Sequence, residues 1–279
     1  MTRRVVSLVL LSLAAAGATT AVARADGLPV LGVDVGASGV LSAAGDARYV
    51  TIPSGHATVL ARVRTSGGQV VASRVLRGRF TVPAVAYDGS ASGLAADGHT
   101  LVLIEPRVSF PRTWTRLLVV DAKRLRPRQL LRLHGDFSFD AISPRGSLVY
   151  LIQYVAPNDP NRYLVRAYNL ATGRLLPRPI VDSREPDEQM RGRPLTRVAS
   201  PGARWAYTLY DGAGDAPFVH ALDTSTGSAR CIDLEMLPRR DLWQLRLSLD
   251  RAGRTLTVSA RQQRLVSIDT RSFRVAAVE

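Results

Sequence analysis

Residues 142–152 read Ile-Ser-Pro-Arg-Gly-Ser-Leu-Val-Tyr-Leu-Ile, a tight turn followed directly by a strand-forming run. Pro144 sets the φ angle that the second position of a turn requires, and Gly146 can adopt the positive φ that many turns need. The run Leu-Val-Tyr-Leu-Ile is rich in branched and aromatic side chains, which favour strands. The stretch therefore predicts the corner between two adjacent β-strands.

The same turn-and-strand unit recurs along the chain. Equivalent turns begin at Ser42, Ala95, Ser200 and Asp250, and each precedes an apolar run. These runs are Tyr49-Val-Thr-Ile52, Leu101-Val-Leu-Ile104, Ala206-Tyr-Thr-Leu209 and Leu256-Thr-Val258. Successive units lie about 50 residues apart, and a period of that size built from short strands predicts propeller blades or solenoid coils.

A second marker repeats in the same phase as the first. It is an apolar run that enters a polar turn, as in Ala221-Leu-Asp-Thr-Ser-Thr-Gly227. The Asp can accept hydrogen bonds from the backbone two residues on, and the Gly can adopt a left-handed conformation. Related versions occur at 63–67, 119–122, 167–173 and 267–270. Each repeat therefore reads as four antiparallel strands, and the sequence predicts an all-β fold, a β-propeller of about five four-stranded antiparallel blades.

Residues 143–151 and 221–227 resemble the repeats of secreted bacterial β-propeller proteins of the YVTN and TolB-like (WD40-like) class. Repeats of that class carry an S-P-D-G-x-x-L-Y-V turn and an I-D-T-x-T-G turn. The resemblance covers nearly all of residues 36–279 at the level of the repeat, and it implies a propeller fold. Many members of the class have seven blades, whereas five repeats are counted in this chain.

The first 25 residues have the pattern of a cleaved export signal. Arg3 and Arg4 form a basic start, 5–16 form an apolar stretch, and Ala23-Arg24-Ala25 fits a cleavage site. We therefore expect a secreted or cell-envelope protein with no stable membrane insertion after cleavage. Export through the general route and through the twin-arginine route are both open.

The remaining residues, 26–279, are expected to form a single propeller domain. Residues 26–35 are read as a lead-in, an extra outer strand on the last blade that closes the ring. The five blades are predicted at 36–76, 77–133, 134–181, 182–235 and 236–279.

The amino-acid composition limits the kinds of partner that we expect this protein to bind. The net charge is +14, and the excess comes from arginines spread over every repeat. Because aromatic residues make up only 6% and the arginines are not clustered with them, we expect no nucleic-acid surface. The charge instead fits attraction to anionic cell-wall polymers or lipid head groups. Cys231 is the single cysteine, so no intrachain disulfide is possible, and we expect it to be buried.

The variable loops define the expected binding face. In a four-stranded meander the first and third turns lie at one end, and these are the short repeated turns. The longer and more varied connections fall at the other end, at 105–116, 156–160, 211–215, 81–92, 134–139, 182–194 and 237–243. Variable loops on a rigid scaffold are a common place for a binding site. The charged loop 182–194 is either a docking loop or a solvated loop, and 211–215 is either a calcium loop or a plain hairpin turn.

Two sets of candidate residues follow from this placement. The ligand-binding candidates are Trp114, Asp140, Arg197, Trp243 and Arg246, which are expected around the mouth of the channel. The alternative catalytic candidates are Asp88, Asp136 and Asp140, which are expected near the inner strands of blades 2 and 3. Ordinary hydrogen bonding and ion pairing between blades is the favoured explanation of these charges. His56, His99, His134 and His220 show no metal-ligand spacing, and no G-x-S-x-G is present, so we expect no metal, no cofactor and no catalytic serine.

The sequence therefore favours an exported, non-enzymatic propeller that acts as a monomeric binding or scaffold module. Its expected partner is a protein, a peptide or a cell-wall saccharide held on the variable-loop face. The alternative is a lactonase-like or glycan-cleaving propeller hydrolase that uses carboxylates at the channel mouth. Fold alone does not separate the two, because propellers host both kinds of function.

Overall fold

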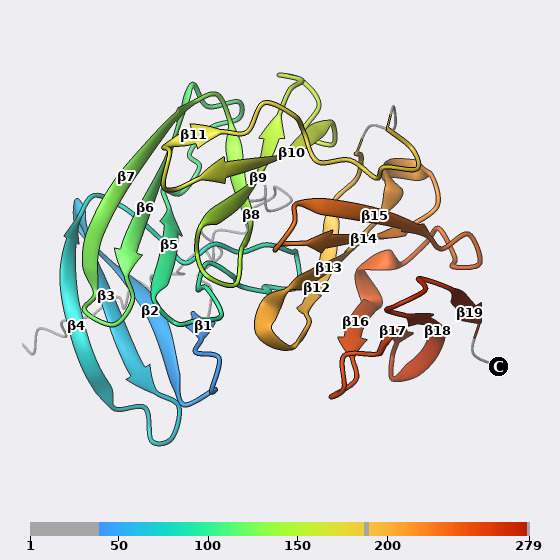
Figure 1. The fold of residues 1–279 in the computed structure, drawn as a ribbon, viewed down its shortest axis with the longest axis horizontal. Coiled ribbons are helices and arrows are strands. Elements are labelled where there is room, and N and C mark those ends of the chain that lie inside the picture. The colour runs from blue at the N-terminus through green and yellow to red at the C-terminus, as the bar shows by residue number, and fades with distance from the viewer. Residues whose placement is uncertain (1–38, 187–189, 278–279) are drawn as a thin grey trace, which may run out of the picture.

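A computed structural model describes residues 39–186 and 190–277 of this protein. Its elements are strands and three short 3₁₀ turns, and the strands form five antiparallel sheets. The sheets follow one another in chain order around a common centre (Figure 1). Each sheet is one blade, so the predicted five-bladed propeller is confirmed. The export signal at 1–25 and the lead-in at 26–35 lie outside the described residues.

The first three blades follow one another along the chain. Blade 1 consists of β1 (Val40–Leu41), β2 (Ala47–Ser54), β3 (Ala57–Arg64) and β4 (Val70–Arg77). Blade 2 consists of β5 (Thr100–Ile104), β6 (Trp114–Asp121) and β7 (Arg126–His134). Blade 3 consists of β8 (Phe137–Ile142), β9 (Leu148–Tyr154), β10 (Tyr163–Asn169) and β11 (Arg174–Leu175).

The last two blades are complete four-stranded meanders. Blade 4 consists of β12 (Pro194–Ala199), β13 (Trp205–Tyr210), β14 (Phe218–Asp223) and β15 (Ser228–Asp233). Blade 5 consists of β16 (Leu245–Leu249), β17 (Thr255–Ala260), β18 (Gln263–Asp269) and β19 (Val275–Ala277). The 3₁₀ turns are η1 (Pro201–Ala203), η2 (Gly212–Gly214) and η3 (Leu242–Gln244).

The repeated turn of residues 143–146 joins β8 to β9, as predicted. The hydroxyl of Ser143 accepts hydrogen bonds from the backbone N–H groups of Ser147 and Leu148, at 3.0 and 2.9 Å. Gly146 has a φ of 67°, and a Cβ there would stand 2.6 Å from the hydroxyl of Thr100 in blade 2. Glycine is therefore required at this position both by the backbone angle and by the neighbouring blade.

Blade 2 differs from the prediction, because its sheet has three strands instead of four. Its inner position is held by isolated bridges, which pair Leu94 with Leu101 and Thr81 with Ile104. Residues 80–92, here called the central segment, lead up to this position, and 80–86 are all buried. The N–H groups of Tyr87 and Asp88 donate to the carbonyls of Pro194 and Leu195 in blade 4, at 3.0 and 3.1 Å. The central segment thus connects blade 2 to blade 4 through the middle of the molecule.

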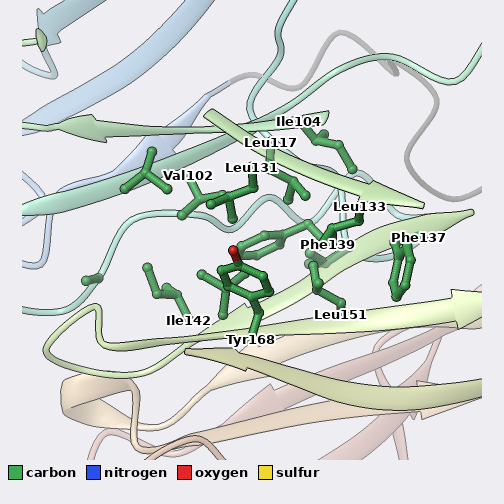
Figure 2. Packing of buried hydrophobic residues seen from close by; sticks show 14 residues of the cluster. Val102, Ile104, Leu117, Leu131, Leu133, Phe137, Phe139, Ile142, Leu151 and Tyr168 are labelled. Atoms are coloured by element: carbon green, nitrogen blue, oxygen red, sulfur yellow. The ribbon is translucent and has the colours of Figure 1, made fainter. Parts of the chain in front are cut away.

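Apolar side chains fill the space between successive blades. One cluster joins blade 2 to blade 3 and includes Val102, Leu117, Leu131, Phe139 and Leu151 (Figure 2). Comparable clusters join blade 1 to blade 2, blade 3 to blade 4, and blade 4 to blade 5. Among the described residues no such cluster joins blade 5 to blade 1. The core therefore consists of four interfaces between five blades.

Two further expectations concern burial and membranes. Cys231 is buried in β15, as predicted. In the described part of the chain, we find no helix with the length and apolar character needed to cross a bilayer.

We expect the interfaces between blades to dominate stability. Leu101 in β5 is 0% exposed and packs between blades 1 and 2, whereas Leu130 in the outer strand β7 is 42% exposed. Leu101→Ala should lower the free energy of unfolding by about 2 to 5 kcal/mol, because it leaves a cavity that the two blades cannot close. Leu130→Ala, the same chemical change, should cost about 1 kcal/mol or less. Chemical denaturation of both variants measures the difference, and equal losses would contradict the prediction.

Candidate functional site

A groove opens at the variable-loop end between the central segment, blade 4 and the start of blade 5. It has a volume of about 570 Å³. We call it the Trp243 groove, and it is lined by Tyr87, Asp88, Arg193, Leu195, Asp211, Arg239, Asp241, Leu242, Trp243 and Arg246. Three of the residues singled out in the sequence, Asp88, Trp243 and Arg246, therefore lie in one hollow.

The blade 5 wall of the groove presents an exposed aromatic ring beside an arginine. Trp243 lies in the 3₁₀ turn η3 that leads into β16, and it is 68% exposed. Arg246 donates from one Nη atom to the carbonyls of Trp243 and Leu245, at 2.9 and 2.8 Å. No described carboxylate lies within ion-pairing distance of Arg246. Its guanidinium therefore keeps donors available for a ligand.

The blade 4 wall is held by an ion pair. Arg193 Nε donates to Asp211 at 2.7 Å, and the backbone N–H of Arg193 donates to the same carboxylate at 2.8 Å. Asp211 also accepts from the N–H of Ala213 at 3.1 Å, inside the turn η2. The carboxylate of Asp211 thus fixes the turn at 211–215 to the strand that follows Arg193. Among the described residues no group of three potential metal ligands occurs.

The floor of the groove is the tip of the central segment. The carboxylate of Asp88 accepts from the N–H and the hydroxyl of Ser90, at 2.9 and 2.6 Å, and so closes a turn. Tyr87 is half-buried beside it, and burial raises the pKa of its phenol. The phenol therefore stays protonated at neutral pH and offers a hydrogen bond at the groove surface.

Asp136 lies elsewhere, in a buried cluster of charges. Its side chain is 2% exposed, and its Oδ1 is 2.6 Å from Arg107, which is 1% exposed. The N–H of Arg112 donates to the other oxygen at 3.0 Å. The guanidinium of Arg107 also stacks 4.7 Å from the ring of Tyr154. These contacts satisfy Asp136 within the protein.

Asp140 forms a second, separate pair with Arg197. The two side chains, from β8 of blade 3 and β12 of blade 4, are 3% and 6% exposed. Arg197 Nε also donates to the hydroxyl of Thr208 at 2.7 Å. The structure therefore pairs Asp140 with Arg197, two of the residues that the sequence placed around the mouth of the channel. It does not gather Asp88, Asp136 and Asp140 into one carboxylate group, because each has its own partners, and Arg246 lies in the Trp243 groove instead of opposite them.

The other candidate aromatic lines a second groove, between blades 1 and 2. Trp114 is 55% exposed and meets the ring of His134 edge to face at 5.1 Å. This groove has a volume of about 500 Å³, and Arg79, Phe80, Pro106 and Val108 are among the residues that line it. Trp114 and Trp243 thus belong to the same end of the propeller but to different hollows.

A larger hollow, of about 1110 Å³, lies against the loops of blades 3 and 4. Its lining is strongly charged and includes Asp159, Asp215, Asp233, Glu235 and Arg239. Burial and the nearby Glu185 and Glu235 raise the pKa of Asp233. The lining therefore carries charges of both signs, since Arg162 and Arg191 also belong to it.

Sequence reasoning missed Tyr87, Arg193 and the pair Arg107 and Arg112. Tyr87 falls in a connection recognised as variable, but no local pattern indicates that this connection reaches blade 4. Arg193 and Asp211 are 18 residues apart and meet only because β12 and β13 are antiparallel neighbours. The one local sign that Arg193 belongs to a site is its charge within a variable loop, and many loops carry such a charge.

Known proteins resemble this chain in fold. No protein-family model and no curated sequence match it. Hydrazine synthase from Kuenenia stuttgartiensis superposes with a TM-score of 0.50 at 16% identity, over 85% of this chain and 64% of that one. An oligogalacturonate lyase in complex with manganese gives a TM-score of 0.51 at 14% identity, over 86% and 63%. TolB from Acinetobacter baumannii gives 0.45 at 12% identity, over 82% and 50%.

The chain thus spans less than two thirds of the length of these three structures. The likeness supports the β-propeller fold predicted from the repeat. At such low identity the likeness shows the fold alone, and function has to come from the site.

A buried histidine next to the Asp140–Arg197 pair makes stability depend on pH. His220 in β14 is 1% exposed, and its Nε2 has no hydrogen-bond partner. Burial lowers the pKa of His220 from 6.5 to about 4, which outweighs the attraction of Asp140 and Asp182. The unfolded chain therefore binds a proton between pH 6.5 and 4 that the folded chain does not.

We expect neutral His220 to make its full contribution to the free energy of unfolding above pH 6.5. This contribution should decrease as the pH falls toward 4. A pKa shift of this size corresponds to about 3 kcal/mol. His220→Gln should flatten that part of the profile, whereas His56→Gln, at an exposed position, should leave it unchanged. Thermal denaturation at a series of pH values tests this. An unchanged slope in the His220 variant would show that other groups cause the acid loss.

Proposed function

We propose that this protein is an exported, non-enzymatic binding module that holds a segment of a partner protein in the Trp243 groove. The observation that carries the proposal is the pairing of an exposed Trp243 with Arg246, which has no carboxylate partner among the described residues. Tryptophan, tyrosine and arginine are the side chains that contribute most often to binding at protein interfaces. All three occur in this groove.

The groove also suggests what the partner segment contains. The groove lining carries three arginines and three aspartates, and of these aspartates Asp211 is paired with Arg193. Arg246 offers donors that suit a carboxylate. The indole of Trp243 offers an apolar surface next to it. We infer that the bound segment places an acidic side chain beside an apolar one.

The hydrolase alternative gains no support from the positions of its candidate residues. Asp136 and Asp140 are each 3% exposed and paired with arginine, so neither faces a hollow that a substrate could enter. Asp88 is exposed, but its carboxylate closes its own turn. A pair of carboxylates facing one cleft, which glycoside hydrolysis requires, is not formed by these residues.

Selection from a library of random displayed peptides tests the binding site. We expect enriched peptides to carry an acidic residue next to an apolar one. Trp243→Ala should weaken a selected peptide by about tenfold or more, as expected for a central interface residue. Arg246→Ala should weaken it most at low ionic strength. Binding is measured by fluorescence anisotropy with the labelled peptide.

Trp114→Ala removes the same side chain from the other groove and serves as the control. It should leave the affinity of the selected peptide unchanged. A loss with Trp114→Ala and none with Trp243→Ala would place the site between blades 1 and 2. If the protein binds cell-wall saccharides but no peptide, and Trp243→Ala abolishes that binding, the partner is a cell-wall polymer and not a protein.

Export is the second part of the proposal and rests on the pattern of residues 1–25. If the signal is cleaved after Ala25, the exported protein should begin at Asp26. Mass spectrometry of the protein recovered from outside the cytoplasm measures its first residue. Recovery of the whole chain with Met1 in the cytoplasm would overturn this part.

A further inference from the structure

The groove between blades 1 and 2 combines apolar walls with arginines. We call it the Trp114 groove, and its volume is about 500 Å³. Its walls come from β2 and β3 of blade 1, the central segment, the loop that follows β5 and the start of β6. It shares none of its lining residues with the Trp243 groove, so the two hollows are separate.

The walls of the Trp114 groove are largely apolar. Leu118 in β6 packs against blade 1, and Trp114 lies on the same face of that strand. Trp114 is 55% exposed and Val108 is 90% exposed. Phe80 and Pro106 also line the hollow. Apolar and aromatic walls of this kind are typical of sites that hold the apolar part of a small ligand.

At the floor of the groove, two arginines share one carboxylate. Arg112 lines the hollow, and its side chain is only 9% exposed. Its Nε lies 3.3 Å from Asp136 Oδ1, the same oxygen that lies 2.6 Å from Arg107. The two Nη atoms of Arg112 donate to the carbonyls of Glu105 and Phe137. The Nε of Arg112 is buried and makes no hydrogen bond to any described residue.

The carboxylates do not balance the arginines around this groove. Both oxygens of Glu105 accept hydrogen bonds from Arg116, one of them at 2.7 Å. Arg79 is exposed, and no carboxylate of residues 39–186 or 190–277 lies within ion-pairing distance of it. The charged groups in and below the groove are thus the arginines Arg79, Arg107, Arg112 and Arg116 and the carboxylates Glu105 and Asp136. Four positive charges face two negative ones, which leaves an excess of two positive charges.

This excess is costly at the floor, because a buried charge needs full compensation. Burial and the repulsion from Arg107 lower the pKa of Arg112 from 12.5 to about 10. Tyr154, against which Arg107 stacks, supplies no further negative charge, because burial raises the pKa of its phenol. An anion that enters the groove would offset this cost, since it would meet Arg112 at the floor and Arg79 at the rim.

We propose that the Trp114 groove binds a small organic acid with an apolar body. The carboxylate of the acid accepts hydrogen bonds from Arg79 and Arg112, and its apolar body lies against Trp114 and Val108. The volume of the groove lies within the range of about 300 to 1,000 Å³ that is usual for small-molecule sites. Arg112 is set too deep for the surface of a folded partner to reach, whereas a small molecule can enter. The site is independent of the peptide proposed for the Trp243 groove.

Two related fluorescent dyes test this in the full-length chain. Anilinonaphthalene sulfonate is an apolar aromatic anion, and phenylnaphthylamine has nearly the same rings without the charge. We expect Trp114→Ala to weaken the binding of the anionic dye about tenfold. Arg79→Gln should weaken the anionic dye about threefold and leave the affinity of the uncharged dye unchanged. Arg77→Gln, at an exposed arginine outside the lining, is the matched control and should change neither affinity.

Competition then identifies the class of ligand. Decanoate, an apolar carboxylate, should displace the anionic dye, whereas inorganic phosphate should not. Decanoate should also raise the temperature of thermal unfolding, because a ligand that binds only the folded chain stabilises it. This increase should be smaller in Trp114→Ala.

Three outcomes would overturn the proposal. Equal weakening of both dyes by Arg79→Gln would mean that the groove does not recognise charge. Displacement by phosphate but not by decanoate would mean that the apolar walls take no part. Loss of dye binding in Trp243→Ala, with none in Trp114→Ala, would place the dye in the other groove. A thermal transition measured on each variant separates these outcomes from unfolding, and Arg79→Gln, at an exposed position, still tests the site if Trp114→Ala does not fold.

Discussion

The packing of apolar side chains between successive blades is the constraint on which the rest of this structure depends. Each blade alone is a small twisted sheet, and such a sheet buries too little to be stable by itself. Stability arises when the face of one blade meets the face of the next, as Val102 and Leu117 of blade 2 meet Phe139 and Leu151 of blade 3. A repeat protein of this kind is held by contacts between neighbours. Blades 1 and 5, the two terminal blades, differ from the others because each packs against only one described neighbour.

Polar groups between the blades are tolerated where they are paired. Asp140 and Arg197 lie between blades 3 and 4, and Asp136 lies with Arg107 near the end of blade 3. Replacing one member of such a pair would leave an uncompensated charge in a buried site, which is costly. Asp136 and Asp140 are each paired with an arginine in this way, so these two ion pairs help to hold the inner ends of the blades together.

The central segment connects the buried inner part of the molecule to its exposed rim. Its buried part, 80–86, fills the middle of the molecule and replaces the inner strand of blade 2. Its tip, at Tyr87 and Asp88, bonds to β12 and forms the floor of the Trp243 groove. One connection thus takes the inner position of blade 2 and also lines the neighbouring groove.

The local sequence determined the blades of this protein. Turns such as Ser143–Gly146 and Asp223–Gly227 depend on side chains that bond to the backbone within a few residues, and on glycines that adopt positive φ. The alternation of apolar residues between these turns determined the strands. Because all of these effects act over short distances along the chain, the number and order of the blades could be predicted. The burial of Cys231 and the exposure of Trp114 and Trp243 followed from their places in strands or variable loops.

Tertiary structure alone decided how distant segments meet. The central segment reaches blade 4 because the ring brings residues 87 and 194 together, and nothing in either stretch encodes that approach. Asp136 pairs with Arg107 instead of joining Asp140, because the loop that follows β5 folds over the start of β8. Trp243 and Arg246 share a groove with Tyr87 and Arg193 only through the packing of blade 5 on blade 4. Local patterns fix each element, whereas contacts between elements depend on the geometry of the whole ring.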